Sequence, residues 1–165
     1  MKIAFVAGFG PITTDNEASI RFWRDDMALP LEEIAPEYWG TDDLPGVQAF
    51  AAWPLAEASE SCFGTKAWPE DVPAPQSWIE MDVLSPDDVA VAAGELERAG
   101  HRILKQAATE PWGQTVARLL SPEGMLVGIT YTPWMHVDHH DHDHEHEGHD
   151  HGDHEGHDHG DHAEH

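Results

Sequence analysis

The clearest alternation of hydrophobic and polar positions lies at 78–83 and predicts a strand. The Ser-Pro-Asp-Asp segment at 85–88 supplies a capping hydroxyl, a proline in the first turn and carboxylates at the positive end of a helix. Apolar residues then recur at helical spacing until Gly100, which ends the helix. Three further strands are predicted at 101–105, 114–120 and 125–131.

The first half of the chain repeats this order with weaker signals. An apolar run at 3–9, which glycines and a proline end, predicts a strand. The polar residues 14–17 begin a helix that Pro30 ends. The apolar face of this helix consists of Ile20, Trp23 and Met27. Short strands are predicted at 31–34, 47–53 and 61–66, and 69–75 is a proline-bounded connection between the halves.

Both halves therefore have the order β-α-β-β-β. Two such modules side by side form a curved antiparallel or mixed sheet, and its uncovered face forms a cup. The predicted fold class is α+β, with paired βαβββ modules in residues 1–135 and a disordered tail in residues 136–165. Because side chains alternate along a strand, Trp78, Glu80 and Asp82 face the cup, and Ile79, Met81 and Val83 lie under the helix.

Three segments resemble one known superfamily. Asp15, followed by Ala-Ser-Ile-Arg-Phe-Trp-Arg-Asp at 18–25, resembles its first helix. Pro-Trp-Gly at 111–113 and Ser-Pro-Glu-Gly-Met-Leu at 121–126 resemble its signature near the end of the second module. On these segments, residues 3–132 resemble the vicinal oxygen chelate superfamily of glyoxalases, bleomycin resistance proteins and dioxygenases. The resemblance implies a homodimer and a divalent metal ion held in the cup by three or four His, Glu or Gln side chains.

The resemblance places those ligands at Gly8, Trp78 and Gly128 of this chain. Glycine has no side chain, and an indole offers an N–H rather than a lone pair. A stable Zn, Fe or Mn site needs about three converging protein ligands. We therefore predict no cofactor in the cup and no metal chemistry of the glyoxalase I or extradiol dioxygenase kind.

The cup is predicted instead to bind a small planar or cationic molecule, between aromatic walls and near acidic groups. The glycines at 8 and 128 are expected to leave room for it. This interpretation resembles the metal-free, drug-sequestering branch of the superfamily. The predicted ligand-contacting residues are Trp78, Glu80, Asp82, Trp112 and Arg118.

Each of these residues also has another interpretation. Trp78 could fill the cup as packing, and Glu80 and Asp82 could form a solvated strand face or a general acid–base pair. Arg118 could form a surface salt bridge, and Cys62 could pack without reacting. No catalytic residue is predicted. The alternative function is a lyase, isomerase or dioxygenase of the superfamily with an unusual site.

The last part of the chain, 136–165, consists almost entirely of His, Asp, Glu and Gly, whereas 1–135 contains every Trp, Phe, Tyr, Lys and Arg. Only the first part can therefore bury a core. Closely spaced imidazoles with carboxylates between them predict binding of a divalent transition metal such as Zn, Ni, Cu or Co. The predicted ligands are His139, His140, His142, His144, His146, His149, His151, His154, His157, His159 and His162. A metal chaperone or storage protein, a solubilising acidic tail and a purification tag are the alternatives.

The formal net charge of −24 limits the partners of the protein. Such a surface repels phosphate backbones and anionic lipid, so neither nucleic acid nor membrane is a predicted partner. Cys62 is the single cysteine and cannot form an internal disulfide, as is typical of a reducing compartment. The first apolar run is too short for a signal peptide or a membrane span. These features predict a cytoplasmic protein.

Overall fold

The computed structural model describes residues 1–136. The predicted tail ligands, from His139 to His162, and the predicted disorder of the tail lie outside these described residues. The first module contains β1 (Ile3–Thr13), α1 (Asn16–Ile20), η1 (Arg21–Asp26), β2 (Glu32–Ala35), β3 (Tyr38–Thr41) and β4 (Phe50–Pro54). After α2 (Leu55–Phe63), the second module contains β5 (Ser77–Val83), α3 (Pro86–Arg98), β6 (Ile103–Thr109), β7 (Thr115–Leu120) and β8 (Leu126–Tyr131), and η2 (Pro133–Met135) follows it.

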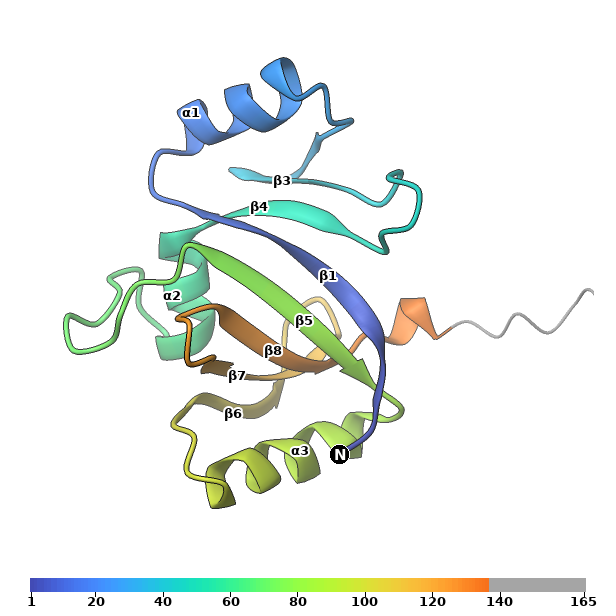
Figure 1. The fold of residues 1–165 in the computed structure, drawn as a ribbon, viewed down its shortest axis with the longest axis vertical. Helices are drawn as coiled ribbons and strands as arrows, with labels where there is room; N and C mark the ends of the chain where they lie inside the picture. Colours follow the sequence, from blue (N-terminus) through green and yellow to red (C-terminus); the bar gives the residue numbers. More distant parts are fainter. Residues whose placement is uncertain (137–165) are drawn as a thin grey trace, which may run out of the picture.

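The strands form one curved sheet of eight strands in the order β2-β3-β4-β1-β5-β8-β7-β6. Strand β1 pairs in parallel with β4, and β5 pairs in parallel with β8. The two modules meet where β1 and β5 run antiparallel. Figure 1 shows α1 and α3 at opposite ends of the molecule, with α2 behind the sheet. The predicted α+β class and the paired βαβββ modules are confirmed.

The helix of the second module forms as its sequence predicts. The Ser85 side chain caps α3 by accepting a hydrogen bond from the backbone N–H of Asp88 at 3.3 Å. A buried apolar cluster joins this helix to the sheet: Val83, Val89, Ala92, Ala93, Ala117 and Ile129. This packing fixes α3 on one face of β5 and β8, so the alternate residues of both strands are turned to the opposite face.

The helix of the first module differs from the prediction over its second half. Asp15 caps α1 by accepting a hydrogen bond from the backbone N–H of Ala18 at 3.0 Å. The helix then continues as the π-helix η1, in which the Met27 N–H bonds to the Phe22 carbonyl, five residues earlier. This wider turn changes which residues face the sheet. Ile20 is buried as predicted, but Met27 is 52% exposed, so its predicted place on the apolar face is wrong.

Two strand predictions are also wrong. Strand β1 does not end near Gly10 but continues to Thr13. A Cβ at Gly10 would lie 1.9 Å from the Ala51 carbonyl oxygen, so this glycine permits a close approach of β4 rather than a turn. The first half of the segment predicted as a strand at 61–66 belongs to α2, which Gly64 caps with φ of 71°. Strand β3 was not predicted.

No helix within residues 1–136 has both the length and the apolar character that crossing a lipid bilayer requires.

Candidate functional site

The cup face is the face of the sheet opposite α1 and α3. Trp78 and Leu126 lie on it and pack in one cluster with Ala58 and Cys62 of α2. Val127, Ile129 and Tyr131 belong to the cluster under α3 on the other face. The predicted division of β5 between the two faces is therefore confirmed for Trp78 on the cup face and for Met81 and Val83 under α3.

Helix α2 covers part of the cup face and changes what the cup contains. Ala58 is fully buried against the sheet, and Cys62 is 8% exposed. They are four positions apart, so they lie on one side of the helix. The sequence predicts a strand in this segment and an open hollow beside it. The structure places a helix there instead, because α2 turns its small apolar side chains onto Trp78 and Leu126.

Trp78 fills the middle of the cup. Its side chain is 6% exposed, and its indole Nε1 donates a hydrogen bond to the Ala51 carbonyl oxygen at 3.0 Å. Its ring centroid lies 6.0 Å from that of Trp53, in an edge-to-face contact. A Cβ at Gly8 would lie 3.0 Å from Trp78 Cη2. The indole therefore occupies the space beside Gly8 that was predicted to be open.

Glu80 occupies the space beside the second glycine. Gly8, Glu80 and Gly128 lie in register on the adjacent strands β1, β5 and β8. A Cβ at Gly128 would lie 2.9 Å from Glu80 Cγ. The prediction that these glycines leave room for a ligand is wrong, because the side chains of β5 lean across both positions.

Arg118 lies at the centre of a cluster of charged groups on the cup face. Arg118 is 1% exposed. Its Nη1 donates hydrogen bonds to Glu110 Oε1 at 2.9 Å and to Ser61 Oγ at 2.6 Å. Its Nη2 donates to Glu80 Oε1 at 3.3 Å. Its guanidinium carbon lies 5.0 Å from the Trp53 ring centroid. Arg118 therefore forms buried ion pairs rather than the surface salt bridge considered from the sequence.

Lys105 balances the charge of this cluster. Its Nζ donates to Glu110 Oε1 at 2.5 Å. With it, two cations, Arg118 and Lys105, face two carboxylates, Glu80 and Glu110. We call these four residues and Ser61 the Arg118 cluster. Because its two positive and two negative charges pair with one another, the cluster leaves no unpaired charge to attract a charged ligand.

The topology of this cup is shared with solved structures. No protein-family model and no curated protein sequence matches the chain. A glyoxalase/bleomycin resistance protein/dioxygenase superfamily member from Vibrio splendidus 12B01 gives a TM-score of 0.53 at 15% identity, covering 78% of this chain and 98% of that one. The chain has the fold of this superfamily. We call it the glyoxalase fold below.

Two other solved structures that match this chain carry different protein names. A chain named NAD-dependent benzaldehyde dehydrogenase, from Legionella pneumophila, gives a TM-score of 0.52 at 12% identity and covers 75% of this chain and 96% of its own length. A glyoxalase/bleomycin resistance protein/dioxygenase from Nocardioides has 20% identity and a TM-score of 0.35, covering 79% and 85%. The likeness to the Legionella chain concerns the fold alone.

The metal site that the resemblance implies for a glyoxalase fold does not fit the residues present here. Gly8 and Gly128 bring no donor atom, and the Trp78 N–H is already donated to Ala51. The Trp78 ring and the Glu80 stem fill the space next to the two glycines. Within residues 1–136, no group of three or more His, Cys, Asp or Glu side chains is arranged to hold a metal ion.

Two further groups near the cup are held in their neutral forms. Burial raises the pKa of the Tyr38 phenol, and the nearby Glu80 carboxylate raises it further. Burial also raises the pKa of the Cys62 thiol, against the opposing effect of Arg118 and Lys105. Cys62 therefore packs in the core as a neutral thiol, in agreement with its non-reactive interpretation.

The ionisation of Glu110, in the Arg118 cluster, is tied to folding. Burial by itself would raise its pKa, but hydrogen bonds from Lys105, Ser61 and Arg118 lower the pKa below its usual value of 4.5. A carboxyl group with a lowered pKa in the folded state stabilises the fold above its unfolded pKa. This contribution is lost as the pH falls from about 4.5 through the lower folded value.

We expect Glu110→Gln to lower the free energy of unfolding at pH 7 and to weaken its dependence on pH between about 5 and 3. The measurement is urea unfolding followed by tryptophan fluorescence at several pH values. Glu97→Gln, at an exposed position on α3, is the control and should keep the wild-type pH dependence. An equally steep pH dependence in Glu110→Gln and the wild type would contradict the assignment.

Asp82, predicted as a cup residue, lies apart from the Arg118 cluster. It is fully buried, and its Oδ1 lies 2.5 Å from His136 Nε2. Its other oxygen, Oδ2, has no hydrogen-bond partner among the described residues. Asp82 and Glu80 therefore do not form an acid–base pair: one pairs with His136 and the other with Arg118.

Trp112 lies at the rim of the cup rather than in its wall. It is 54% exposed, and its Nε1 donates to Gln114 Oε1 at 3.1 Å. Gln114 in turn donates to Glu80 Oε2 at 2.9 Å. This chain of hydrogen bonds connects the exposed Trp112 to the Arg118 cluster through one buried amide.

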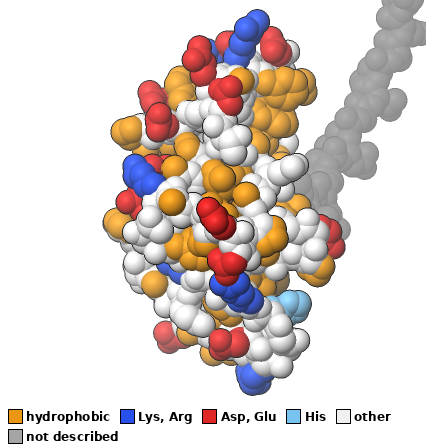
Figure 2. All heavy atoms as spheres, turned by 90° about the vertical axis from the view of Figure 1, so that its left-hand side faces the viewer, with side chains coloured by type: hydrophobic (Ala, Val, Ile, Leu, Met, Phe, Trp, Pro, Cys, Tyr) orange, Lys and Arg blue, Asp and Glu red, His pale blue; other side chains and the backbone are white. Residues whose placement is uncertain are grey.

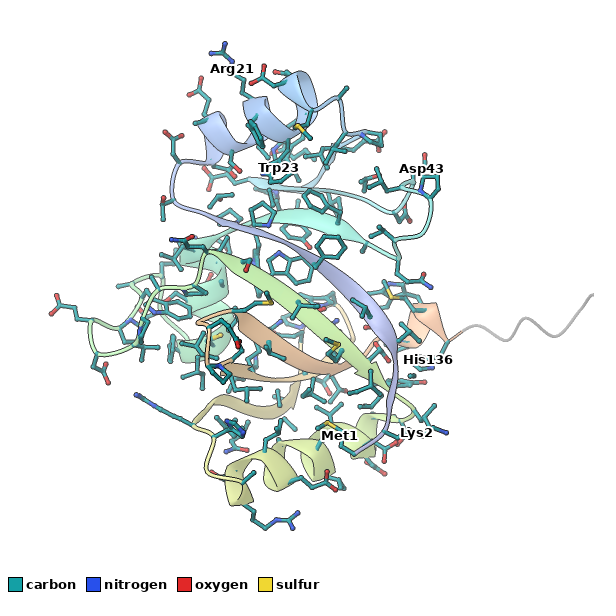
Figure 3. The ribbon with its side chains drawn as sticks, in the orientation of Figure 1. Met1, Lys2, Arg21, Trp23, Asp43 and His136 are labelled. Atoms are coloured by element: carbon teal, nitrogen blue, oxygen red, sulfur yellow. The ribbon has the colours of Figure 1, made fainter. Side chains whose placement is uncertain are left out.

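The structure contains an apolar groove of about 330 Å³ where the two modules meet. Its wall contains Phe9, Trp23, Trp78, Ile79 and Met125. Figure 3 shows Trp23 pointing from η1 toward the sheet. Figure 2 views the side where α2 and the loop before β5 lie, and hydrophobic side chains gather around its middle. Of the five predicted ligand-contacting residues, only Trp78 lines the groove, and no residue that lines it is charged.

Several residues of the site were not predicted from the sequence. Ser61, Glu110 and Lys105 complete the Arg118 cluster, and Tyr38 and Gln114 adjoin Glu80. No local pattern marks Ser61, because its partner Arg118 lies 57 positions further along the chain. Glu110 lies only eight positions before Arg118, but it stands outside the predicted strands, where no side-chain alternation indicates its direction. Lys105 carried a usable signal: like Arg118, it is a basic residue in a predicted strand of the second module.

Proposed function

We propose that this protein sequesters divalent transition metal through the His-rich segment 136–165, and that its glyoxalase-fold domain does not use the metal centre implied by the resemblance. The observation that carries the proposal is ligand density. All but one of the 14 His residues of the chain lie in this segment, with Asp and Glu between them. Imidazole nitrogens so closely spaced let one ion contact several of them.

The residues of the cup also favour metal binding by the tail rather than by the folded domain. Trp78 fills the space next to Gly8, and the charges of the Arg118 cluster are paired with one another. The metal ligands of the chain are therefore concentrated in the tail. Zn, Ni, Cu and Co all suit mixed imidazole and carboxylate ligands, and the tail is proposed to select weakly among them. A cytoplasmic metal buffer, store or donor to a partner protein matches this chemistry.

The direct test is metal stoichiometry at pH 7.5. We expect the full-length protein to bind several Zn²⁺ or Ni²⁺ ions, and a version ending at His136 to bind none. A second variant keeps the full length but replaces every His of 137–165 with Gln, so its acidic residues remain. It should also lose the metal, and the wild type should release it below about pH 6 as the imidazoles protonate.

Each rival function predicts a different result. A metal-dependent enzyme with an unusual site would retain a stoichiometric ion in the version ending at His136. An acidic solubilising tail would bind metal equally well after the His-to-Gln replacement, or would not bind it at all. Either outcome would overturn the proposal.

A second candidate function is the binding of a small planar molecule, and the apolar groove favours it. The groove is lined by aromatic and aliphatic side chains and has the volume of a small binding site. Glu80 and Asp82 are paired with Arg118 and His136, and the described lining of the groove offers no carboxylate to the cation expected from the sequence. We therefore propose a neutral planar ligand.

We expect 2-naphthol to raise the melting temperature of the full-length protein in EDTA, and 2-naphthylmethylammonium to raise it less. Phe9→Ala should remove the shift, because Phe9 lines the groove. Phe22→Ala is the matched control, since Phe22 is similarly exposed but lies outside the groove lining. If both variants retain the shift, the groove is not the binding site.

A further inference from the structure

The imidazole of His136 occupies a small site at the end of the sheet, formed by one acidic and two aromatic side chains. Its ring stacks on Tyr131 with centroids 4.5 Å apart and planes inclined by 27°, and its centroid lies 5.2 Å from that of Phe5. Its Nε2 lies 2.5 Å from Asp82 Oδ1. Figure 3 shows His136 beside η2, at the end of the sheet. Asp82, Phe5 and Tyr131 therefore surround one planar ring, and we call these three residues the Asp82 site.

Asp82 is the buried polar group of this site. It is 0% exposed, and the register of the sheet places it between Phe5 of β1 and Thr130 of β8. Within residues 1–136, His136 is its one ion-pair partner. A carboxyl group that is removed from water needs hydrogen-bond donors or a positive charge to offset the cost of its burial. The site therefore attracts an N–H donor, whichever molecule supplies it.

His136 satisfies only one of the two oxygens of Asp82. Its Nε2 contacts Oδ1, whereas Oδ2 is buried without a hydrogen-bond partner among the described residues. The two nitrogens of an imidazole point away from each other, so one ring cannot donate to both oxygens of a carboxyl group. An amidinium or guanidinium group carries two parallel N–H groups that match these two oxygens, and its flat face stacks on aromatic rings. A planar cation of this kind fits the Asp82 site better than the imidazole does.

The position of His136 lets it close this site from outside. Its side chain is 18% exposed, so it covers the buried Asp82 at the surface of the domain. It follows η2, a single turn of three residues that has no side-chain cap. Its backbone N–H donates to the Pro133 carbonyl at 3.2 Å, and Trp134 in the same turn is 51% exposed. Moving His136 outward therefore opens the site without breaking a hydrogen bond of the sheet.

We propose that the Asp82 site binds a small planar cation of the amidinium or guanidinium type, and that His136 is an internal plug which this ligand displaces. The contact between His136 and Asp82 is then autoinhibitory, because it occupies the carboxyl group when the ligand is absent. The inference is independent of the metal proposed for the tail. It is also independent of the apolar groove, which lies against residues 77–79, at the opposite end of β5 from Asp82.

The test uses benzamidinium, a planar cation with two parallel N–H groups, and the full-length protein in EDTA at pH 7.5. Calorimetric titration measures its affinity. We expect His136→Gly to bind it at least about tenfold more tightly than the wild type, because a plug lowers the apparent affinity by the fraction of molecules in which the site is open. His101→Gly removes an exposed imidazole of the same domain and keeps the acidic tail, so it should bind as the wild type does.

Two further measurements test the role of the carboxyl group. Benzamide, a neutral analogue of the same shape, should bind His136→Gly more weakly than benzamidinium does. Asp82→Asn in the His136→Gly background should lose the tight binding of benzamidinium, because the amide replaces one acceptor with a donor. Equal affinity of the wild type and His136→Gly, equal binding of the two compounds, or tight binding that survives Asp82→Asn would overturn the proposal.

The wild type decides the question if either variant does not fold. Saturating benzamidinium should then shift the NMR ring signals of Phe5, Tyr131 and His136, because the ligand takes the place of the imidazole between the two aromatic rings. Benzamide at the same concentration should leave these signals in place. If benzamidinium leaves them unchanged as well, His136 is not displaced and the proposed site is wrong.

Discussion

Replacing Arg118 with methionine lowers the free energy of unfolding by about 3–5 kcal/mol, the usual cost of removing one partner from a buried ion pair. Arg118 is 1% exposed and bonds to both Glu80 and Glu110. Methionine keeps much of the side-chain volume but leaves Lys105 as the single cation for two buried carboxylates. Urea unfolding at pH 7, followed by the fluorescence of the tryptophans, measures the loss.

Arg102→Met is the matched control for this substitution. The Arg102 and Asp71 side chains are 66% and 73% exposed and lie 3.4 Å apart, so their ion pair contributes about 0–1 kcal/mol. The double variant Arg118→Met with Glu110→Gln removes one charge of each sign. It should recover part of the lost stability. If Arg118→Met is no less stable than Arg102→Met, the Arg118 cluster does not hold the cup together.

Replacing Trp78 with alanine is expected to cost about 3–5 kcal/mol, because a large buried side chain is lost and the surrounding structure closes only in part. Trp78 is 6% exposed and packs on Trp53 and α2. Its removal also leaves the Ala51 carbonyl without the indole hydrogen bond. The same urea experiment measures this loss.

The cavity left by Trp78→Ala should bind indole. We expect millimolar indole to raise the melting temperature of this variant by more than it raises that of the wild type. Trp112→Ala removes an indole that is 54% exposed, so it should cost little stability and gain no response to indole. An unchanged stability of Trp78→Ala would show that Trp78 is not the residue that fills the cup.

Much of the fold follows from short-range patterns. The cap at Ser85, the helical spacing that follows it and the alternation at 78–83 together predicted α3 and β5. The helix start at 14–17 was also predicted, and Asp15 is the residue that caps it. The errors occur where one local sequence pattern is compatible with two different local structures. The segment at 61–66 contains apolar residues between polar ones, and its membership of α2 depends on packing against Trp78 and Leu126. A glycine such as Gly10 similarly marks a turn or a close contact between strands.

The candidate site was predictable in its composition but not in its pairing. The alternation of β5 placed Trp78, Glu80 and Asp82 on the cup face, and the structure confirms that face for Trp78. It did not show that Glu80 and Asp82 already have partners, because those partners, Arg118 and His136, come from other parts of the chain. The role of these residues toward a ligand stays a prediction.

The sequence by itself determined the order of the elements in the second module, the lack of donor atoms at Gly8 and Gly128, and the concentration of imidazoles after residue 135. These depend on the residues themselves or on neighbours within one or two helical turns. The tertiary structure alone decided what fills the cup and where His136 rests. Ser61 meets Arg118 across 57 positions and Asp82 meets His136 across 54. Such contacts form only when distant segments pack together, because burial then makes unpaired charges costly.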